Sequence, residues 1–169
     1  IGSLIDEVQY DMIYHEHIYY YSLITLQKFF SKFDFEIFNI KPIPIHGGSM
    51  RYYVRNIGKL IDKKISLKLL NLQKNEYSKG YNQKSTFIDY AKKVDITRKN
   101  LMNLLNKIKK EKKTIVGYGA SGRANTLIQF CKIDDKLLDY IVDDAPMKQG
   151  YYTPGSHLLI KSREALNEE

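Results

Sequence analysis

Residues 114–122 read TIVGYGASG, a short apolar run that passes into a glycine-rich turn. Residues 124–131 continue with the apolar spacing of a helix, and residues 137–142 (LLDYIV) form a second apolar run. A strand, a helix and a second strand within about 30 residues have the length of a parallel crossover unit. The sequence therefore predicts an α/β protein with a small βαβ domain at residues 114–169.

The glycine turn has the pattern G-x-G-x-x-G, formed by Gly117, Gly119 and Gly122 between the predicted strand and helix. Glycines permit the tight turn and let the backbone approach a phosphate, which the helix N-terminus then stabilises. Asp143 follows Gly122 by 21 residues, where a dinucleotide site has its ribose-binding acid, and Arg123 adds a cation. The pattern is typical of a Rossmann-like domain with a nucleotide-containing ligand. The alternative is that the glycines only shape a close strand–helix turn.

Upstream of this unit, the sequence predicts a helix and a pair of strands. Apolar residues recur at helical spacing over residues 22–33, and Ser22 is the expected N-cap. Residues 35–40 and 50–54 alternate between polar and apolar side chains, which favours an antiparallel pair. The chain begins at Ile1, and we expect that it was cut from a longer protein.

Positive charge is concentrated in the middle third of the chain. The formal charge is +8 overall, but residues 58–113 alone carry +11, with 16 Lys and Arg against 5 Asp and Glu. Arg98 is the one Arg among them, whereas specific contacts to nucleic acid favour Arg. Leu and Ile recur every three or four positions there, which predicts helices joined near Gly80. We interpret this segment as a solvated helical linker without a specific nucleic-acid site.

Composition excludes several classes of protein. Cys131 is the single cysteine, so a disulfide scaffold or a cysteine-ligated zinc site within the chain is excluded. No apolar run approaches the ~20 residues of a membrane span, and no signal-peptide pattern is present. We therefore expect a cytoplasmic protein without a membrane partner. The sequence carries no signal for an oligomeric state.

A dense group of acid–base side chains lies in Tyr14-His15-Glu16-His17. His15 and His17 point to the same side of an extended segment, so with His46 they could form a three-nitrogen metal site. Alternatively, one His is a general base held by Glu16, with phenols such as Tyr14 as donors to an oxyanion. A third interpretation is a loop whose polar tips reach solvent. We favour the acid–base interpretation, because no further His or carboxylate cluster supports a metal.

Two glycine-containing loops accompany these motifs. His46-Gly47-Gly48-Ser49 joins the two predicted antiparallel strands, where glycines allow a ligand to lie against the backbone, although a simple hairpin turn is the alternative. Lys148-Gln149-Gly150 follows the second predicted parallel strand. Ligands of open α/β sheets bind beyond the carboxyl ends of the strands, so this loop and the glycine turn should face one crevice.

Taken together, the motifs resemble the S-adenosylmethionine-dependent sugar C-methyltransferases. The matching segments, in chain order, are Tyr14-His15-Glu16-His17 with Tyr20, His46-Gly47-Gly48-Ser49 with Arg51, Gly117-Tyr118-Gly119-Ala120 with Asn125, and Lys148-Gln149-Gly150 with Pro154-Gly155. The resemblance implies the last part of a methyltransferase Rossmann domain at residues 1–57, a helical linker at 58–113 and a Rossmann-like C-terminal domain at 114–169.

The resemblance also implies a reaction. The substrate would be a nucleotide-linked 4-keto-deoxysugar, methylated at the carbon beside the ketone. His17 would remove the α-proton, with Glu16 orienting it or sharing the work, and Tyr14 and His46 would donate to the enolate oxygen. S-adenosylmethionine would be bound mainly by a region upstream of this chain, and no metal is expected.

The remaining matching positions are expected to hold the nucleotide sugar. They are Tyr20, Ser49, Arg51, Gly117, Gly119, Arg123, Asn125 and Lys148. One position departs from the pattern of the family, because Gly122 completes a dinucleotide fingerprint that the family does not require. This leaves a second hypothesis, an NAD-dependent oxidoreductase or a nucleotide-binding module built on the turn from Gly117 to Gly122.

Overall fold

The computed structural model of the chain describes residues 1–45, 47–58 and 64–167. The chain forms two compact units, the first from residues 1–9 and 19–92 and the second from residues 10–18 and 93–169. It is an α/β protein, with an antiparallel strand pair in the first unit and a three-stranded parallel sheet in the second. The division into three domains at residues 57 and 113 stays a prediction.

The first unit is built on an antiparallel hairpin. Strands β1 (Phe35–Ile43) and β2 (Ser49–Asn56) pair along their whole length, as the alternating pattern predicts. The register shifts between Ile37 and Asn39. This irregularity lets Ile37 and Ile40 both reach the core, although three positions separate them and a regular strand would turn them to opposite faces.

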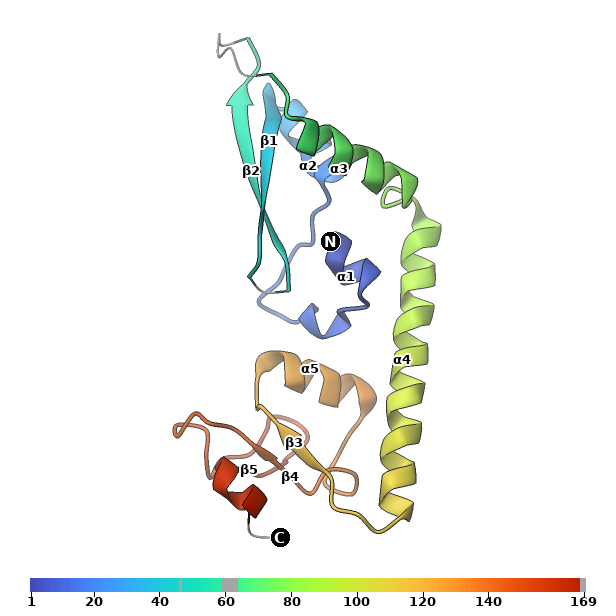
Figure 1. Ribbon diagram of the computed structural model, residues 1–169, viewed down its shortest axis with the longest axis vertical. Coiled ribbons are helices and arrows are strands. Elements are labelled where there is room, and N and C mark those ends of the chain that lie inside the picture. The colour runs from blue at the N-terminus through green and yellow to red at the C-terminus, as the bar shows by residue number, and fades with distance from the viewer. Residues whose placement is uncertain (46, 59–63, 168–169) are drawn as a thin grey trace. The chain divides into compact units, whose positions relative to one another are not determined.

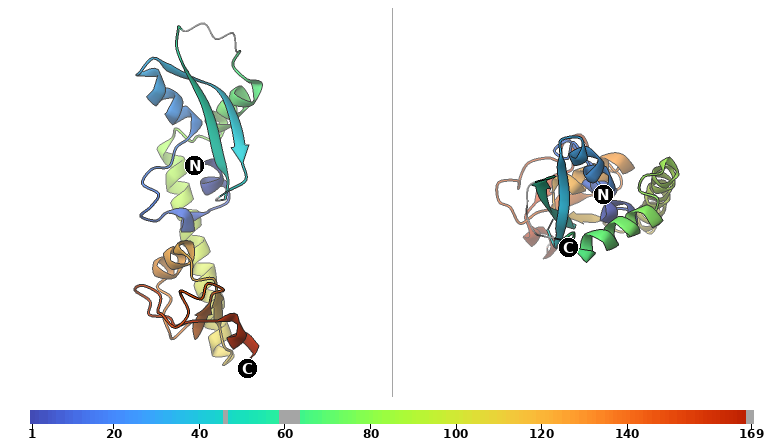
Figure 2. Two further views of the ribbon diagram at one scale, coloured as in Figure 1. Left: turned by 90° about the vertical axis from the view of Figure 1, so that its left-hand side faces the viewer. Right: turned by 90° about the horizontal axis from the view of Figure 1, so that it is seen from above.

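The first unit contains helices α1 (Gly2–Asp6), α2 (Leu23–Ser31) and α3 (Leu67–Ser78). Ser22 caps α2 as predicted, since its side chain accepts a hydrogen bond from the Thr25 amide. Leu23 of α2 and Leu69 of α3 are fully buried against the hairpin. Both helices therefore cover one face of the hairpin, whose strands β1 and β2 lie side by side in Figure 2.

Helix α4 (Lys84–Lys110) is the long Lys-rich helix of the predicted linker. It is separated from α3 by a turn in which Gly80 has a φ of +68°, so the predicted break near this glycine is confirmed. The residues of α4 up to Lys92 group with the first unit and the later ones with the second. Within the described part of the chain, none of the helices has the length and apolar character needed to cross a membrane.

The second unit carries the predicted crossover. Strand β3 (Val116–Tyr118) leads through α5 (Gly122–Cys131) to β4 (Tyr140–Val142), and β5 (Ile160–Lys161) completes a parallel sheet of order β3-β4-β5. Central β4 is buried at every position, as expected for a strand covered on both faces. It is shorter than the predicted run because Leu137 and Leu138 donate their amides to the Asp134 carbonyl in a turn.

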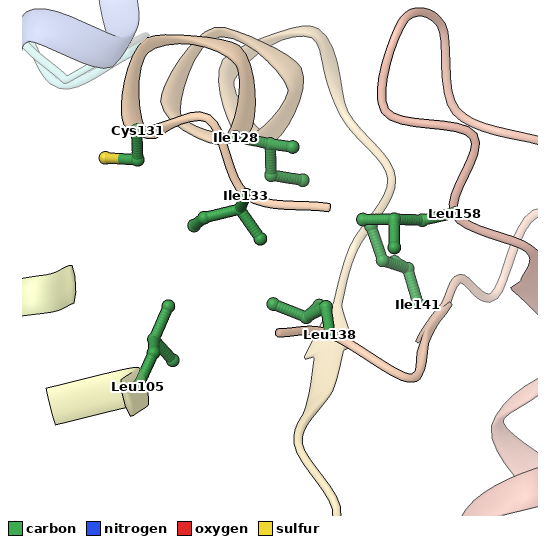
Figure 3. Packing of buried hydrophobic residues seen from close by; sticks show 7 residues of the cluster. All are labelled: Leu105, Ile128, Cys131, Ile133, Leu138, Ile141 and Leu158. Carbon is green, nitrogen blue, oxygen red and sulfur yellow. The ribbon is translucent and has the colours of Figure 1, made fainter. Parts of the chain in front are cut away.

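The sheet of the second unit is covered on both faces. Helix α5 and the end of α4 bury an apolar cluster against one face (Figures 1 and 3). Its members are Leu105, Ile128, Cys131, Ile133, Leu138, Ile141 and Leu158. On the other face, Tyr140 and Val142 pack against Ala165 of the 3-10 helix η2 (Arg163–Asn167). The sheet therefore holds the carboxyl ends of β3 and β4 in fixed positions.

Candidate functional site

The glycine turn is fastened to the end of β4. Gly119 has a φ of +93°, which a side chain would disfavour, and its amide donates to the Val142 carbonyl at 2.7 Å. The next amide, that of Ala120, donates to Asp143 Oδ2, also at 2.7 Å. The turn predicted from the glycines is therefore present, and Asp143 fixes its shape.

Asp143 is buried, and both of its carboxylate oxygens are engaged. Oδ1 accepts from the Ala145 amide at 2.9 Å, and Oδ2 accepts from Lys148 Nζ at 3.0 Å. The Ala145 amide and the Lys148 ammonium hold the pKa of this carboxyl below its usual value. These bonds close the loop after β4 rather than present an acceptor to a ligand. The hypothesis that Asp143 binds a ribose is therefore not favoured.

Lys148 contacts both the glycine turn and the end of β4. Its Nζ donates to the Ala120 carbonyl and to Asp143 Oδ2, at 3.0 Å each, while 42% of its side chain stays exposed. Gln149 adds a bond from its side-chain amide to the Asp143 carbonyl at 3.0 Å. The loop after β4 and the glycine turn thus form one connected edge, as the topology of a parallel sheet predicts.

The glycines of the turn differ in what surrounds them. A Cβ at Gly117 would lie 2.9 Å from Leu138 Cδ2 and 3.0 Å from Ile141 Cγ1, inside the apolar core. A Cβ at Gly122 would meet nothing within 4 Å. The third glycine of a dinucleotide fingerprint is required for close helix–strand packing, and Gly122 has no such contact. The fingerprint is therefore complete in sequence but not in packing.

This difference predicts opposite results for two matched substitutions. Gly117→Ala should destabilise the second unit by about 1–3 kcal/mol, because the added methyl group overpacks the core. Gly122→Ala should change stability by less than about 1 kcal/mol, in the stabilising direction, because Ala loses less backbone entropy on folding. Native-state hydrogen exchange of the Ile141 amide, which bonds to the Leu159 carbonyl, measures both. Equal losses from the two substitutions would contradict the packing described above.

The first turn of α5 carries three polar side chains with different surroundings. Ser121 caps the helix by accepting from the Ala124 amide at 3.1 Å. Arg123 donates from Nε to Asp11 Oδ2 at 2.7 Å, and its Nη2 lies 2.6 Å from the same oxygen. Asn125 Oδ1 is buried and has no hydrogen-bond partner among the described residues. Such an oxygen usually indicates a missing donor, for which water and a ligand are both candidates.

The acid–base motif follows a 3-10 turn, η1 (Tyr10–Met12), that belongs to the second unit. Tyr10 and Met12 are buried. The Tyr10 ring lies 5.2 Å from the Phe130 ring, and its hydroxyl lies 3.8 Å from Cys131 Sγ. These contacts anchor η1 to α5, beside which it lies in Figure 1. The motif is therefore fixed to the second unit at its N-terminal end.

His17 is half-buried and its ring is oriented by the backbone. Nδ1 lies 2.9 Å from the Met12 carbonyl oxygen. Because a carbonyl only accepts, the proton of the neutral ring lies on Nδ1 and the lone pair on Nε2. The Tyr14 ring packs on the imidazole with 4.3 Å between centroids. The imidazole is thus held in the tautomer that can accept a proton at Nε2.

The other members of the motif are more open. His15 and Glu16 are exposed, and the partner of His17 Nδ1 is the Met12 carbonyl rather than the predicted Glu16. His46 lies outside the described residues, so its predicted roles are not placed. Among the residues that the structure describes, no three His, Cys, Asp or Glu side chains form a group suited to a metal ion.

The predicted site residues are divided between the two units. Those in the second unit are Tyr14, Glu16, His17, Gly117, Gly119, Arg123, Asn125 and Lys148, and those described in the first are Tyr20, Ser49 and Arg51. Tyr20 is half-buried, and Arg51 is exposed on β2. Ser49 donates its hydroxyl to the Ile45 carbonyl at 3.2 Å. The structure therefore places the acid–base motif and the glycine turn in the same unit.

Two residues of the candidate site could not be recognised from the sequence motifs. Asp11 binds Arg123, and Met12 supplies the carbonyl that orients His17. A backbone acceptor has no signature in a side-chain motif. For Asp11, the one available signal is an acid three residues before Tyr14. That signal does not identify its partner Arg123, which lies 112 residues away in the chain.

Comparison with known proteins identifies relatives of the chain. A family model described as the C-methyltransferase C-terminal domain matches residues 44–169. The chain is 26% identical over 162 residues to the C-methyltransferase NovU of Streptomyces niveus, covering 96% of this chain and 38% of that protein. The chain thus spans well under half the length of this relative. The resemblance indicated by the motifs is confirmed.

Proposed function

Because the chain belongs to the C-methyltransferase C-terminal domain family, we propose that it forms part of an S-adenosylmethionine-dependent methyltransferase. The proposed substrate is a nucleotide-linked 4-keto-deoxysugar, methylated at the carbon beside its ketone. The observation that carries this proposal is the His17 imidazole, held by the Met12 carbonyl in the tautomer of a general base. Removing a proton beside a ketone requires such a base near neutral pH.

In the proposed reaction, the chain supplies the proton chemistry. His17 Nε2 takes the α-proton as the C–H bond breaks, and the electron pair moves onto the ketone oxygen as an enolate. The Tyr14 hydroxyl and His46 would donate hydrogen bonds to that oxygen, and exposed Glu16 would stabilise the protonated imidazole. S-adenosylmethionine would supply the methyl group: the enolate carbon would bond to that methyl as the sulfur–methyl bond breaks, and S-adenosylhomocysteine would leave. The proton on His17 then leaves to solvent.

The nucleotide part of the substrate is proposed to bind at the edge formed by the glycine turn and the loop after β4. Support comes from the unpartnered Asn125 Oδ1, an acceptor that suits a ribose hydroxyl, and from the Lys148 ammonium, which suits a diphosphate. Arg123 would border this site while it stays paired with Asp11. Gly117 and Gly119 would shape the turn. For Tyr20, Ser49 and Arg51, which belong to the first unit, a role in substrate binding stays a prediction.

The methyl donor is proposed to bind mainly to residues outside this chain. A nucleoside-binding turn of the usual kind follows a strand and leads into a helix, whereas the strands of the first unit form a hairpin. The glycine turn of the second unit is instead proposed to hold the nucleotide part of the substrate. The described residues therefore leave no second turn of this kind for the adenosine moiety of S-adenosylmethionine.

Thermal melts of the chain with different ligands distinguish the hypotheses. A ligand of the folded state raises stability, by about 2.7 kcal/mol at a hundredfold excess over Kd. We expect a thymidine-diphosphate sugar to raise the melting temperature, and NAD and S-adenosylmethionine to leave it unchanged. Stabilisation by NAD alone would favour the oxidoreductase hypothesis. Tight binding of S-adenosylmethionine would contradict the proposal that the methyl donor binds mainly to residues outside this chain.

A further inference from the structure

The segment that carries His17 is attached to α5 by two adjacent residues. Tyr10 contributes an apolar contact, because its ring packs on Phe130. Asp11, the next residue, contributes the polar contact, with two nitrogens of Arg123 directed at its Oδ2. Apolar contacts resist separation but allow sliding, whereas hydrogen bonds from a planar guanidinium also fix direction. Asp11 therefore sets the orientation of η1 on α5.

The orientation of η1 is passed directly to the imidazole. Met12 follows Asp11 in the chain, and its carbonyl holds His17 Nδ1 at 2.9 Å. The Ile13 amide donates to the Tyr10 carbonyl and the His17 amide donates to the Tyr14 carbonyl, so the intervening backbone turns are also bonded. A rotation of η1 would move the Met12 carbonyl away from Nδ1, and both the tautomer and the direction of Nε2 would change.

We propose that Asp11, through its bond to Arg123, is a positioning residue that keeps the His17 imidazole in its productive orientation. The inference rests on the proposed function of His17 as the base. It gives Asp11 no contact with the substrate. Asp11 acts on the rate of proton removal and not on the binding of the nucleotide sugar, because a base misplaced by about 1 Å can cost about a hundredfold in rate.

The test compares Asp11→Ala and Asp11→Asn in the complete gene product, with Asp135→Ala as a matched control. Asp135 is an exposed acid of the same unit, in the turn after α5. We expect Asp11→Ala to lower kcat about tenfold to a hundredfold with KM little changed, since the lost interaction is with the base. Asp11→Asn keeps an oxygen that accepts from Arg123, so it should retain most of the activity. Asp135→Ala should behave as the unsubstituted protein.

A second measurement does not depend on activity. Nitrogen-15 NMR of the histidine rings distinguishes the Nδ1-protonated tautomer from the mixture found in a mobile imidazole. We expect a single Nδ1-protonated form of His17 in the unsubstituted protein and in Asp11→Asn, and a mixture in Asp11→Ala. Circular dichroism shows whether each variant is folded. If Asp11→Ala does not fold, Arg123→Ala removes the same hydrogen bonds from the other partner. Less of the Nδ1-protonated form in that variant supports the proposal, and none lost overturns it.

The outcomes separate the two proposals. An unchanged His17 spectrum and unchanged kcat in Asp11→Ala would overturn the positioning role. A rise in KM with kcat unchanged in Asp11→Ala would also overturn the positioning role, because such a result would place Asp11 in substrate binding. If the unsubstituted protein transfers no methyl group, the proposed function fails, and the tautomer of His17 in Asp11→Ala alone decides whether Asp11 positions the ring.

Discussion

Substitution of His17 by alanine should lower kcat for methyl transfer about 10²–10⁴-fold in the complete gene product, the usual contribution of a positioned general base. The structure supports this result because the Met12 carbonyl fixes the proton on Nδ1 and leaves the lone pair on Nε2. The nucleotide sugar should still bind, because the residues proposed to hold its nucleotide lie on α5 and the loop after β4. Steady-state kinetics and the Kd of the sugar nucleotide measure the two effects separately.

His15→Ala is the matched control for this experiment. His15 lies two residues from His17 in the same loop, and it is exposed. On the acid–base mechanism, its loss should leave kcat close to that of the unsubstituted protein. A loss of activity in both variants, restored by added zinc, would favour the three-nitrogen metal site instead. Unchanged turnover of His17→Ala would contradict the role of His17 as base.

Substitution of Glu76 by alanine should destabilise the first unit by about 2–4 kcal/mol. Glu76 is an acid in α3, yet it is only 4% exposed. Its two carboxylate oxygens accept the amides of Leu23 and Ile24 at 2.9 Å each, at the N-terminus of α2. Hydrogen bonds to a charged group contribute about 1.5–3 kcal/mol each, and the helix dipole adds to them. The loss would also leave the buried Leu23 amide and the half-buried Ile24 amide without acceptors.

Hydrogen exchange of the Leu23 and Ile24 amides is the direct measurement for Glu76. Both amides should exchange faster in Glu76→Ala. Glu76→Gln should give an intermediate result, because its side-chain amide offers one acceptor to the two backbone amides and also a donor group that neither of them can accept. Lys74→Ala, an exposed substitution on the same helix, should change stability by less than about 0.5 kcal/mol. Unchanged exchange in Glu76→Ala would show that the cap contributes little.

Glu76 has a second consequence that can be measured. Burial and the nearby negative charge of Glu76 raise the pKa of Tyr52 on β2 to about 12. Burial is the larger cause, so Glu76→Gln should lower the pKa of Tyr52 only part of the way towards the ordinary value of about 10. Ultraviolet titration of the phenols reports this change and tests the position of the charge independently of stability.

Local patterns were sufficient for most of the secondary structure. The apolar runs on either side of the glycine turn predict β3, α5 and β4, because strands and helices of a βαβ unit differ in length and spacing. Ser22 was identifiable as an N-cap from its type and position. The hairpin followed from alternation interrupted by Pro and Gly. In each case the information lies within a few residues of the element itself.

Contacts between distant residues could not be predicted in this way. The attachment of η1 to α5 depends on the Asp11–Arg123 pair and on Tyr10 meeting Phe130, partners more than 100 residues apart. Glu76 looked like one more charge on a solvated helix, because only the position of α2 reveals its role. The G-x-G-x-x-G pattern fits Gly122, yet the space around this residue is open. The candidate site was thus identified by residue type, and its internal bonds required the structure.

The most direct measurement is the fate of a labelled methyl group. The complete gene product is supplied with S-adenosylmethionine that carries a carbon-13 methyl group and with a thymidine-diphosphate 4-keto-deoxysugar, and the product is examined by NMR. We predict a methyl carbon bonded to the sugar carbon beside the ketone, formed by the unsubstituted protein and not by His17→Ala. A label on oxygen, or an unlabelled sugar with simultaneous turnover of NAD, would contradict the proposed function.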